Sequence, residues 1–183
     1  MAVLDMDTLL RPAAEAMMKQ AGLDPSDRDS AEYKRLCRDL GYRITMDAAL
    51  ENAASGIDAV VIGPFTKELG DPDWIRRELS SLEGLSVEHQ IEAKAVVVYL
   101  PSEQHYYERI RQRRSELDQW KLDHWDTFRA PLVRREVQWN LPEGAVLYYD
   151  NSEPMTEEAL AGIDRFVFGS DEGADYRQEG SER

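Results

Sequence analysis

The densest cluster of basic side chains in the sequence lies between residues 109 and 121. Its members are Arg109, Arg111, Arg113, Arg114 and Lys121. On a helix, Arg109 and Arg113 share one face and Arg114 lies beside them. The planar guanidinium group binds phosphate oxygens in pairs and stabilises negative charge, so phosphate binding is the chemistry that this cluster offers. A solvated helix face also explains the cluster, with the arginines paired to nearby glutamates: Glu103, Glu108 and Glu116.

Two aspartates, Asp5 and Asp7, follow the first short apolar run at residues 2–4. A carboxylate in this position can accept a proton in catalysis. Acidic side chains near a helix N-terminus also cap the helix and favour its dipole. Both interpretations stay open for the pair, and so does the choice between the two residues.

Three continuous apolar runs have the length and the β-branched character of strands. They are residues 58–63, 93–100 and 145–149, and with the run at 2–4 they alternate with helical segments. Runs that are apolar on both faces suit a parallel sheet covered by helices on both sides. The sequence therefore predicts an α/β doubly wound domain over residues 1–168, followed by a disordered acidic tail at 169–183.

The helical segments are predicted from apolar spacing and capping residues. Thr8 is expected to cap a helix that runs to about Ala21. The apolar face of this helix is predicted to consist of Leu9, Ala13, Ala16 and Met17. Residues 22–30 are rich in turn formers and predict a loop. Further helices are expected at about 31–39, 42–55, 72–82 and 102–114, the last with Ser102 as its N-cap.

Ligands of such sheets bind beyond the carboxyl ends of the strands. The residues at these positions are polar or expose backbone: Asp5, Asp7, and residues 63–65, 101–102 and 150–152. This composition is typical of a catalytic rim. It is also typical of ordinary transitions from strand to loop.

The charge balance excludes several classes of function. Thirty-six acidic against 22 basic residues give a formal net charge of −14. Nucleic acid and anionic membrane surfaces would both repel such a chain, so we expect neither as a partner. No apolar run approaches the ~20 residues of a membrane span, and the first residues lack the pattern of a secretory signal. We therefore expect a soluble cytoplasmic protein.

Metal and thiol chemistry are not expected. The single cysteine, Cys37, excludes an internal disulfide and a multi-cysteine zinc site, and it is predicted to be a small buried apolar residue. The three histidines, His89, His105 and His124, are far apart and lack partners at metal-ligand spacing. The tryptophans are expected to pack helices onto the sheet: Trp74, Trp120 and Trp125.

Five segments, taken in order, resemble a known family. They are residues 4–12 (LDMDTLLRP); 42–43 (YR) with 47–52 (DAALEN); 61–65 (VIGPF) with 71–74 (DPDW); 109–114 (RIRQRR) with 118–125 (DQWKLDHW); and 149–152 (YDNS). Together they resemble the small P-loop kinase-like ATP-binding proteins, often labelled AAA-family ATPases, which are relatives of chloramphenicol phosphotransferase and the zeta-toxin kinases. The resemblance covers residues 2 to about 167.

This resemblance implies a three-layer P-loop NTPase-like parallel sheet with helices on both faces. It implies ATP and Mg²⁺ as cofactors, and phosphoryl transfer to a small-molecule or nucleotide substrate, or ATP hydrolysis. Asp5 or Asp7 would then act as the base or orient Mg²⁺. Arg113 and Arg114, in a lid, would stabilise the transferred phosphoryl group. The other residues that the resemblance implicates are Arg109, Lys121 and Asn151 for the cofactor, and Arg43 and Phe65 for an anionic or hydroxylated substrate.

Ordinary structural roles explain four of these last residues as well. Arg43 fits a surface arginine, Phe65 fits loop or core packing, and Asn151 fits a turn. Lys121 fits an ion pair with Asp118.

The defining loop of that family is absent. A glycine-rich loop ending in Lys-Ser/Thr should follow the first strand and cradle the phosphates, but none of the 11 glycines is followed by Lys. Gly63 stands where many P-loop proteins carry a carboxylate for Mg²⁺. The absent strand is the central one of the family's sheet, and its loss leaves backbone groups of both neighbours unpaired.

Two explanations of this absence stay open. Met1 is an internal or misassigned start of a longer protein, or the chain is a remnant in which the strands flanking the gap pair directly. In the second case the chain is a degenerate, non-catalytic interaction or regulatory module. In both cases we expect the chain as it stands to bind ATP weakly or not at all.

Overall fold

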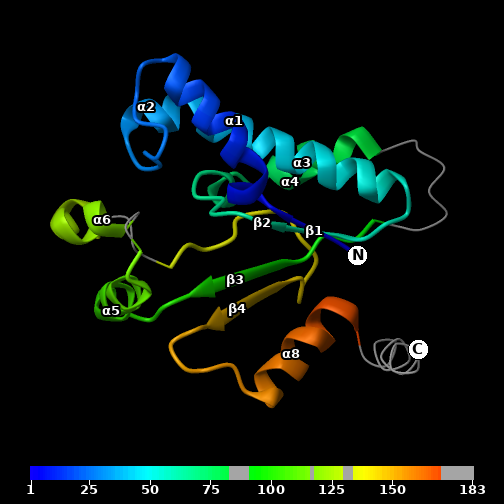
Figure 1. Ribbon diagram of the computed structural model, residues 1–183. Helices are drawn as coiled ribbons and strands as arrows, with labels where there is room; N and C mark the ends of the chain where they lie inside the picture. Colours follow the sequence, from blue (N-terminus) through cyan, green and yellow to red (C-terminus); the bar gives the residue numbers. More distant parts are fainter. Residues whose placement is uncertain (83–90, 116–117, 130–133, 170–183) are drawn as a thin grey trace, which may run out of the picture. The chain divides into compact units, whose positions relative to one another are not determined.

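The computed structural model describes residues 1–82, 91–115, 118–129 and 134–169 (Figure 1). In these residues the fold is mixed α/β, and four strands form two parallel sheets of two strands each. The chain divides into two compact units. One comprises Met1–Glu92, Ser115–Trp120 and Gln138–Asn140, and the other comprises Ala93–Arg114, Lys121–Val137 and Leu141–Arg183.

The first unit is built on the parallel pair β1 (Ala2–Asp5) and β2 (Ala59–Ile62). Its register pairs Ala2 with Ala59 and Asp5 with Ile62, so both strands leave the sheet at the same edge. Its helical elements are α1 (Met6–Gln20), α2 (Ala31–Tyr33), a π-helical turn (Lys34–Arg38), α3 (Asp39–Ala54), a 3₁₀ turn (Glu68–Gly70), α4 (Trp74–Leu79) and a second 3₁₀ turn (Ser80–Leu82). α1 and α3 lie on the same side of β1 and β2 (Figure 1).

The predicted cap and the predicted apolar face of α1 are both wrong. Asp5, in an extended conformation, caps the helix, because its Oδ1 accepts a hydrogen bond of 2.8 Å from the backbone N–H of Thr8. The face that is buried against the rest of the unit lies one residue further along the chain than predicted. It consists of Met6, Leu10, Ala14 and Met18, while Leu9 and Ala16 are exposed.

The two helices expected at 31–39 and 42–55 are one continuous helical run from Ala31 to Ala54. Gly41 does not interrupt it, and this glycine lies where α3 packs against Leu10 of α1. A Cβ atom at Gly41 would lie 2.7 Å from Cδ2 of Leu10. The run contains one π-helical turn, Lys34–Arg38, which holds an extra residue compared with an α-helical turn.

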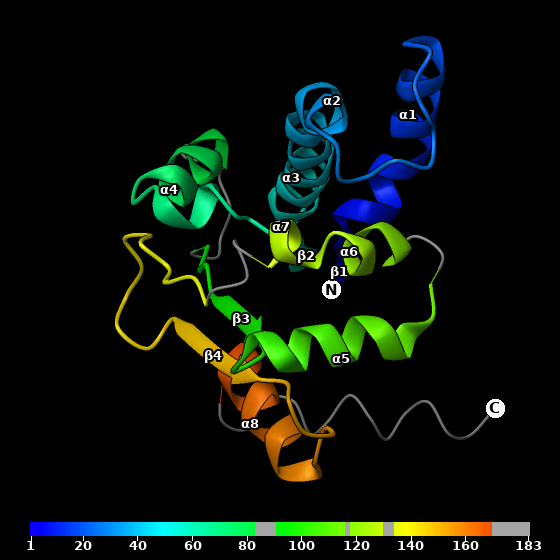
Figure 2. The same ribbon diagram turned by 90° about the vertical axis from the view of Figure 1, so that its left-hand side faces the viewer.

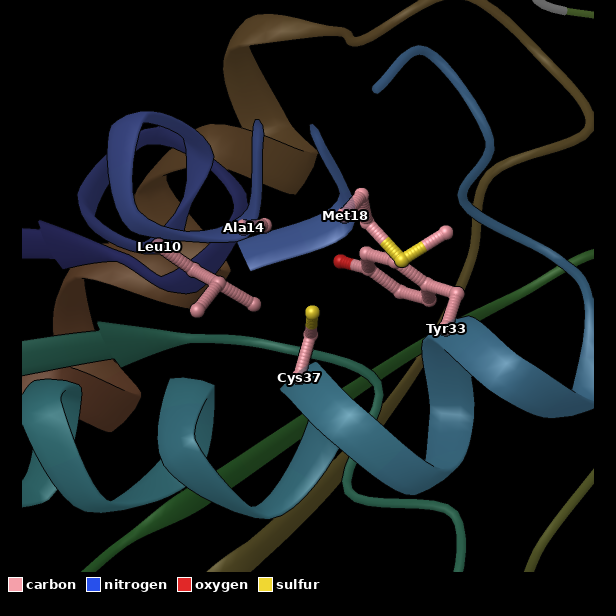
Figure 3. Close-up of a cluster of buried hydrophobic side chains, with 5 residues drawn as sticks. All are labelled: Leu10, Ala14, Met18, Tyr33 and Cys37. Carbon is pink, nitrogen blue, oxygen red and sulfur yellow. The ribbon is translucent and has the colours of Figure 1, made fainter. Parts of the chain in front are cut away.

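Figure 3 shows a cluster of buried apolar side chains in the first unit, in which side chains of α1 point toward those of the helical run from Ala31 to Ala54. Its members are Leu10, Ala14, Met18, Tyr33 and Cys37. Cys37 is fully buried, which confirms the prediction of a small buried apolar residue. Burial raises the pKa of its thiol.

The second unit is built on β3 (Ala95–Tyr99) and β4 (Val146–Asp150), paired in parallel from Ala95 with Val146 to Tyr99 with Asp150. Its helices are α5 (Glu103–Arg113), α7 (Trp125–Phe128) and α8 (Glu157–Phe168), while α6 (Gln119–Asp123) begins in the first unit. Ser102 caps α5 as predicted. Figures 1 and 2 show α8 beside the sheet, where Lys94 of the segment before β3 donates to the carbonyl oxygen of Val167.

The α/β class, the four strands and their parallel pairing are confirmed, but the strands form two sheets rather than one continuous sheet. Apart from Gly169, the tail predicted at 169–183 lies outside the described residues, as does His89. No helix in the described part of the chain is both long and apolar enough to cross a membrane.

Candidate functional site

The first unit contains a cleft of about 180 Å³ between α3, α4 and the turn after β2. Its lining residues are Asp39, Tyr42, Arg43, Met46, Glu68, Trp74 and Glu78. The four that come from α3 are spaced by three, one and three residues, so they share one helix face. Trp74 and Glu78 are likewise one turn apart on α4. The cleft is therefore formed by two helix faces and one loop.

An aromatic cluster supports one side of this cleft. The ring of Phe65 lies 5.3 Å from that of Tyr42 and 5.5 Å from that of Trp74, measured between centroids. Trp74 in turn stacks on Trp139 at 5.1 Å, and the indole N–H of Trp139 donates to the carbonyl oxygen of Glu68 at 2.7 Å. The segment around Trp139 thus holds both the tryptophan of α4 and the turn that carries Glu68.

Phe65 packs behind this wall and is not among the residues that line the cleft. Its φ of +43° lies in the left-handed region, which an aromatic residue adopts at a cost in conformational energy. Its contacts with Tyr42, Trp74 and Trp139 help to offset that cost. The structure therefore gives Phe65 a packing role next to the cleft.

The charged side chains around the cleft are held by ion pairs. Arg38, from the π-helical turn, donates to both carboxylate oxygens of Glu68 at 2.8 and 2.9 Å, and its guanidinium lies 4.8 Å from the ring centre of Tyr42. Burial alone would lower the pKa of Arg38, but the hydrogen bonds to Glu68 and the charge of that carboxylate raise it overall. These two hydrogen bonds fix the position of the Glu68 side chain in the wall of the cleft.

Arg43 lies in the cleft but has its charge compensated. Its Nε is 2.8 Å from Asp47 Oδ1, and its Nη1 is 3.0 Å from Glu78 Oε2. The contact with Glu78 is an ion pair without hydrogen-bond geometry, and Glu78 Oε2 is buried with no hydrogen-bond partner among the described residues. An anionic substrate would therefore compete with two carboxylates for Arg43.

Tyr42 is buried at 7% exposure, and its hydroxyl makes no hydrogen bond within the described part of the chain. Burial, together with the negative charge of Glu68, raises the pKa of Tyr42 to about 12. Arg38 and the nearby backbone N–H groups of Phe65 and Thr66, which make no hydrogen bond of standard geometry to the hydroxyl, act in the opposite direction but are outweighed. Tyr42 is therefore neutral at any physiological pH.

Replacing Tyr42 by Phe is expected to leave the free energy of unfolding unchanged or raised at pH 7, because it removes a buried hydroxyl without a partner. The pKa of Tyr42 is higher in the folded state than in the unfolded state, so unfolding becomes easier once the unfolded tyrosine ionises. The free energy of unfolding is therefore unaffected by the ionisation of Tyr42 below pH 10 and falls as the pH rises from 10 toward 12. Tyr42→Phe should therefore remove an alkaline loss on the order of 1 kcal/mol by pH 11. Urea unfolding of both proteins at pH 7 and 11 measures this, and parallel alkaline losses in the two proteins would refute it.

The other predicted site residues fall into two groups. In the first unit, Asp5 caps α1 while Asp7 lies exposed in its first turn. In the second unit, Arg109 Nη2 donates to the carbonyl oxygen of Asn151 at 2.7 Å, so two of the residues proposed for the cofactor do meet. The ammonium group of Lys121 lies 5.8 Å from the ring centre of Phe128.

Arg113 and Arg114 lie at the C-terminal end of α5, and both are exposed. Arg114 follows the last helical residue with a φ of +49°. The structure thus brings Arg43 and Phe65 to one neighbourhood, and Arg109 and Asn151 to another.

The residues that complete the cleft were not identified from the sequence. They are Asp39, Tyr42, Met46, Glu68, Trp74, Glu78 and, behind them, Trp139. The spacing of the four α3 residues is the one sequence feature that indicates a shared face. In the described residues, no group of three or more His, Cys, Asp or Glu side chains could hold a metal ion.

No family model, curated protein or solved structure matches the chain, so its function is inferred below from its own residues and geometry.

Proposed function

We propose that the chain is the acceptor-binding part of a P-loop kinase-like protein, which in its complete form transfers a phosphoryl group to a small molecule or hydrolyses ATP. The observation that carries this proposal is the division of the strands into two parallel pairs, β1 with β2 and β3 with β4. A parallel sheet that lacks its central strand falls into two smaller parallel sheets. The resemblance implies that the absent strand leaves both of its neighbours without a pairing partner on one side, and two separate parallel pairs fit that implication better than direct pairing of the flanking strands.

The position of the cleft supports an acceptor site. Asp5 pairs in register with Ile62, so Asp5 and the loop after β2 leave the sheet at its carboxyl edge. Phe65 and Glu68 follow on that same loop, and Glu68 lines the cleft. Parallel α/β sheets bind ligands at this edge. We assign the cleft to the acceptor, and one of Asp5 and Asp7 to the acceptor's hydroxyl proton.

The residues present do not fit the triphosphate of ATP. A phosphate cradle needs the backbone N–H groups of a glycine-rich loop and a lysine directly after its last glycine. No glycine of the chain is directly followed by a lysine. Arg109, which the resemblance places near the cofactor, instead holds the backbone of Asn151. The acceptor site is therefore the part of the proposed function that this chain itself carries.

A calorimetric titration with Mg-ATP is expected to give no saturable binding in the micromolar range. The physical reason is the absence of the loop that supplies most phosphate contacts. Titration of inorganic phosphate controls for weak binding by the exposed arginines of α5. Micromolar affinity for Mg-ATP would contradict the expectation and would require a different nucleotide site.

The coding DNA in frame upstream of Met1, together with the intact mass of the native protein, tests the proposal as a whole. A strand followed by a Gly-rich Lys-Ser/Thr loop, with a mass above 21.0 kDa, would support it. A stop codon directly upstream and a mass near 21.0 kDa would refute phosphoryl transfer.

A non-catalytic interaction module is the second candidate, and one observation favours it. Val96 and Val98 lie two residues apart on β3, on the same face, and are 39% and 57% exposed. Apolar side chains at alternating positions of a strand are usually covered. In this second candidate function, the exposed pair is part of a surface that binds another protein.

A further inference from the structure

The residues Gln138–Asn140 belong to the first unit, although the chain on both sides of them belongs to the second. They lie in neither a helix nor a strand, and the chain bends at Trp139. The side chain of Trp139 is half-buried, whereas those of Gln138 and Asn140 are exposed. One side chain of the three is therefore covered, while its two neighbours face water. We call these three residues the arm.

The arm is held to the first unit by three hydrogen bonds, all to carbonyl oxygens of residues 68–72. The backbone N–H groups on either side of Trp139 donate to the carbonyl oxygens of Leu69 and Pro72, at 2.8 and 3.1 Å. The indole N–H of Trp139 donates to the carbonyl oxygen of Glu68 at 2.7 Å. The acceptors are all main-chain groups, so these bonds fix the path of the arm without selecting its side chains.

The indole ring of Trp139 makes the selective contacts. It stacks on the ring of Trp74, with 5.1 Å between centroids and 22° between planes, and it meets the ring of Phe65 edge-on at 6.1 Å. Proteins that recognise short peptides combine main-chain hydrogen bonds with contacts to particular side chains in the same way. The first unit thus holds the arm as it would hold a separate peptide with a tryptophan at its centre.

The residue before the arm is held within the second unit instead. The N–H of Val137 donates to the hydroxyl of Tyr148 at 2.9 Å, and the guanidinium of Arg134 lies 5.0 Å from the ring centre of Tyr148. Release of the arm breaks its three hydrogen bonds and two ring contacts but leaves these anchors intact. A segment with so few contacts opens without unfolding of the whole protein.

We propose that the arm is a detachable peptide ligand of the first unit, and that residues 65–74 form a site for a short peptide with a central tryptophan. In the docked state the chain fills this site itself, and Trp139 supports Trp74 in the wall of the cleft. In the released state the wall loses this support. The arm is therefore a device that changes the shape of the cleft, whether or not the cleft takes part in phosphoryl transfer.

A synthetic peptide of residues 136–142, with both ends blocked, tests the site in the full chain of the variant Trp139→Ala. The indole ¹H–¹⁵N resonance of Trp74, assigned with a Trp74→Phe variant, should shift when the ring of Trp139 is removed. The peptide should return this resonance toward its original position with saturation. The unmodified protein should bind the peptide at least about tenfold more weakly, because its tethered arm already fills the site. The same peptide with alanine in place of tryptophan should have no effect.

Trp125→Ala is the matched control. Trp125 is also half-buried, and its indole N–H also donates a hydrogen bond, but its partner Glu103 lies in the second unit. This variant should leave the resonance of Trp74 in place and bind the peptide no better than the unmodified protein. Equal affinities of the two variants, or no saturable binding to folded Trp139→Ala, would overturn the proposal.

Hydrogen exchange of the unmodified protein decides the matter if Trp139→Ala fails to fold. The amide protons of Gln138 and Asn140 should have similar protection, at least about tenfold lower than that of Met46 and Ala49, two buried residues of α3. If the arm and α3 exchange only together, the arm leaves its site only when the first unit unfolds. It would then be a fixed part of the fold and not a ligand.

Discussion

Replacing Arg38 by Met is expected to lower the free energy of unfolding by about 3 kcal/mol. The side chains of Arg38 and Glu68 are only 15% and 11% exposed, and Arg38 donates to both carboxylate oxygens. Without Arg38, the carboxylate of Glu68 stays in the wall of the cleft with its main counter-charge removed. Methionine keeps much of the apolar contact with the ring of Tyr42, so the loss reports mainly on the charge.

Urea unfolding of Arg38→Met, Glu68→Gln and the double variant measures this effect. Because the two side chains contact each other directly, the double variant should recover much of the loss seen in Arg38→Met. Arg77→Met is the matched control, because the pair that it forms with Asp71 is exposed and screened by solvent. Its change in stability should be much smaller. Similar losses for Arg38→Met and Arg77→Met would mean that the ion pair of Arg38 with Glu68 contributes no more to the free energy of unfolding than the exposed pair of Arg77 with Asp71.

Replacing Leu10 by Ala is expected to cost about 3 kcal/mol, within the range for a fully buried leucine that leaves a cavity. Leu10 is 1% exposed and points into the cluster of Figure 3, between α1 and the helical run from Ala31 to Ala54. Its Cδ2 also occupies the place that a side chain at Gly41 would need. The cavity formed by the substitution therefore opens toward α3.

This geometry predicts that the effect of Gly41→Ala changes sign with the residue at position 10. In the natural background the new Cβ overlaps Leu10, so a cost of about 1–2 kcal/mol remains after the gain in helix propensity. In the Leu10→Ala background that overlap is gone, and Met6 Cγ at 3.3 Å, which can shift into the space that Leu10 leaves, is the tightest remaining contact. Gly41→Ala should then stabilise by at most about 1 kcal/mol. Thermal or urea unfolding of the four proteins measures this coupling.

Gly162→Ala provides the control for helix propensity. Gly162 lies inside α8, and a Cβ there meets no atom within 4 Å. The substitution should stabilise the protein by the same amount whichever residue is at position 10. If Gly41→Ala costs the same in both backgrounds, Leu10 is not what excludes a side chain at Gly41.

The strands could be predicted from the sequence because their apolar runs are continuous and bounded by turn residues. The face of α1 could not, because positions 9–10, 13–14 and 17–18 each hold two consecutive apolar residues. Helical spacing fits either set, and the packing of α1 on the helical run from Ala31 to Ala54 selects Leu10, Ala14 and Met18. The cap was misplaced for a similar reason, since Asp5 and Thr8 are both good caps and only the backbone conformation distinguishes them.

The cleft could be predicted from the sequence less well than the fold. Arg43 and Phe65 were implicated by the resemblance, and they do lie in or beside it. The wall of the cleft is fixed by the stacking of Trp74 on Trp139. Trp139 follows much later in the chain, and its sequence neighbourhood shows no recognisable motif. The ion pair of Arg38 with Glu68 likewise depends on the π-helical turn. No local spacing rule predicts contacts of this kind.

The π-helical turn at Lys34–Arg38 also bears on how this chain can change in length. The turn holds one residue more than an α-helical turn, so the loss of one residue here leaves the helix continuous. Each residue of an α-helix turns the chain by about 100°. Such a deletion would rotate Tyr33 away from Met18, and it would change the local geometry on which the ion pair of Arg38 with Glu68 depends. In evolution, this turn is therefore a place where a deletion alters both the core beneath α1 and the wall of the cleft.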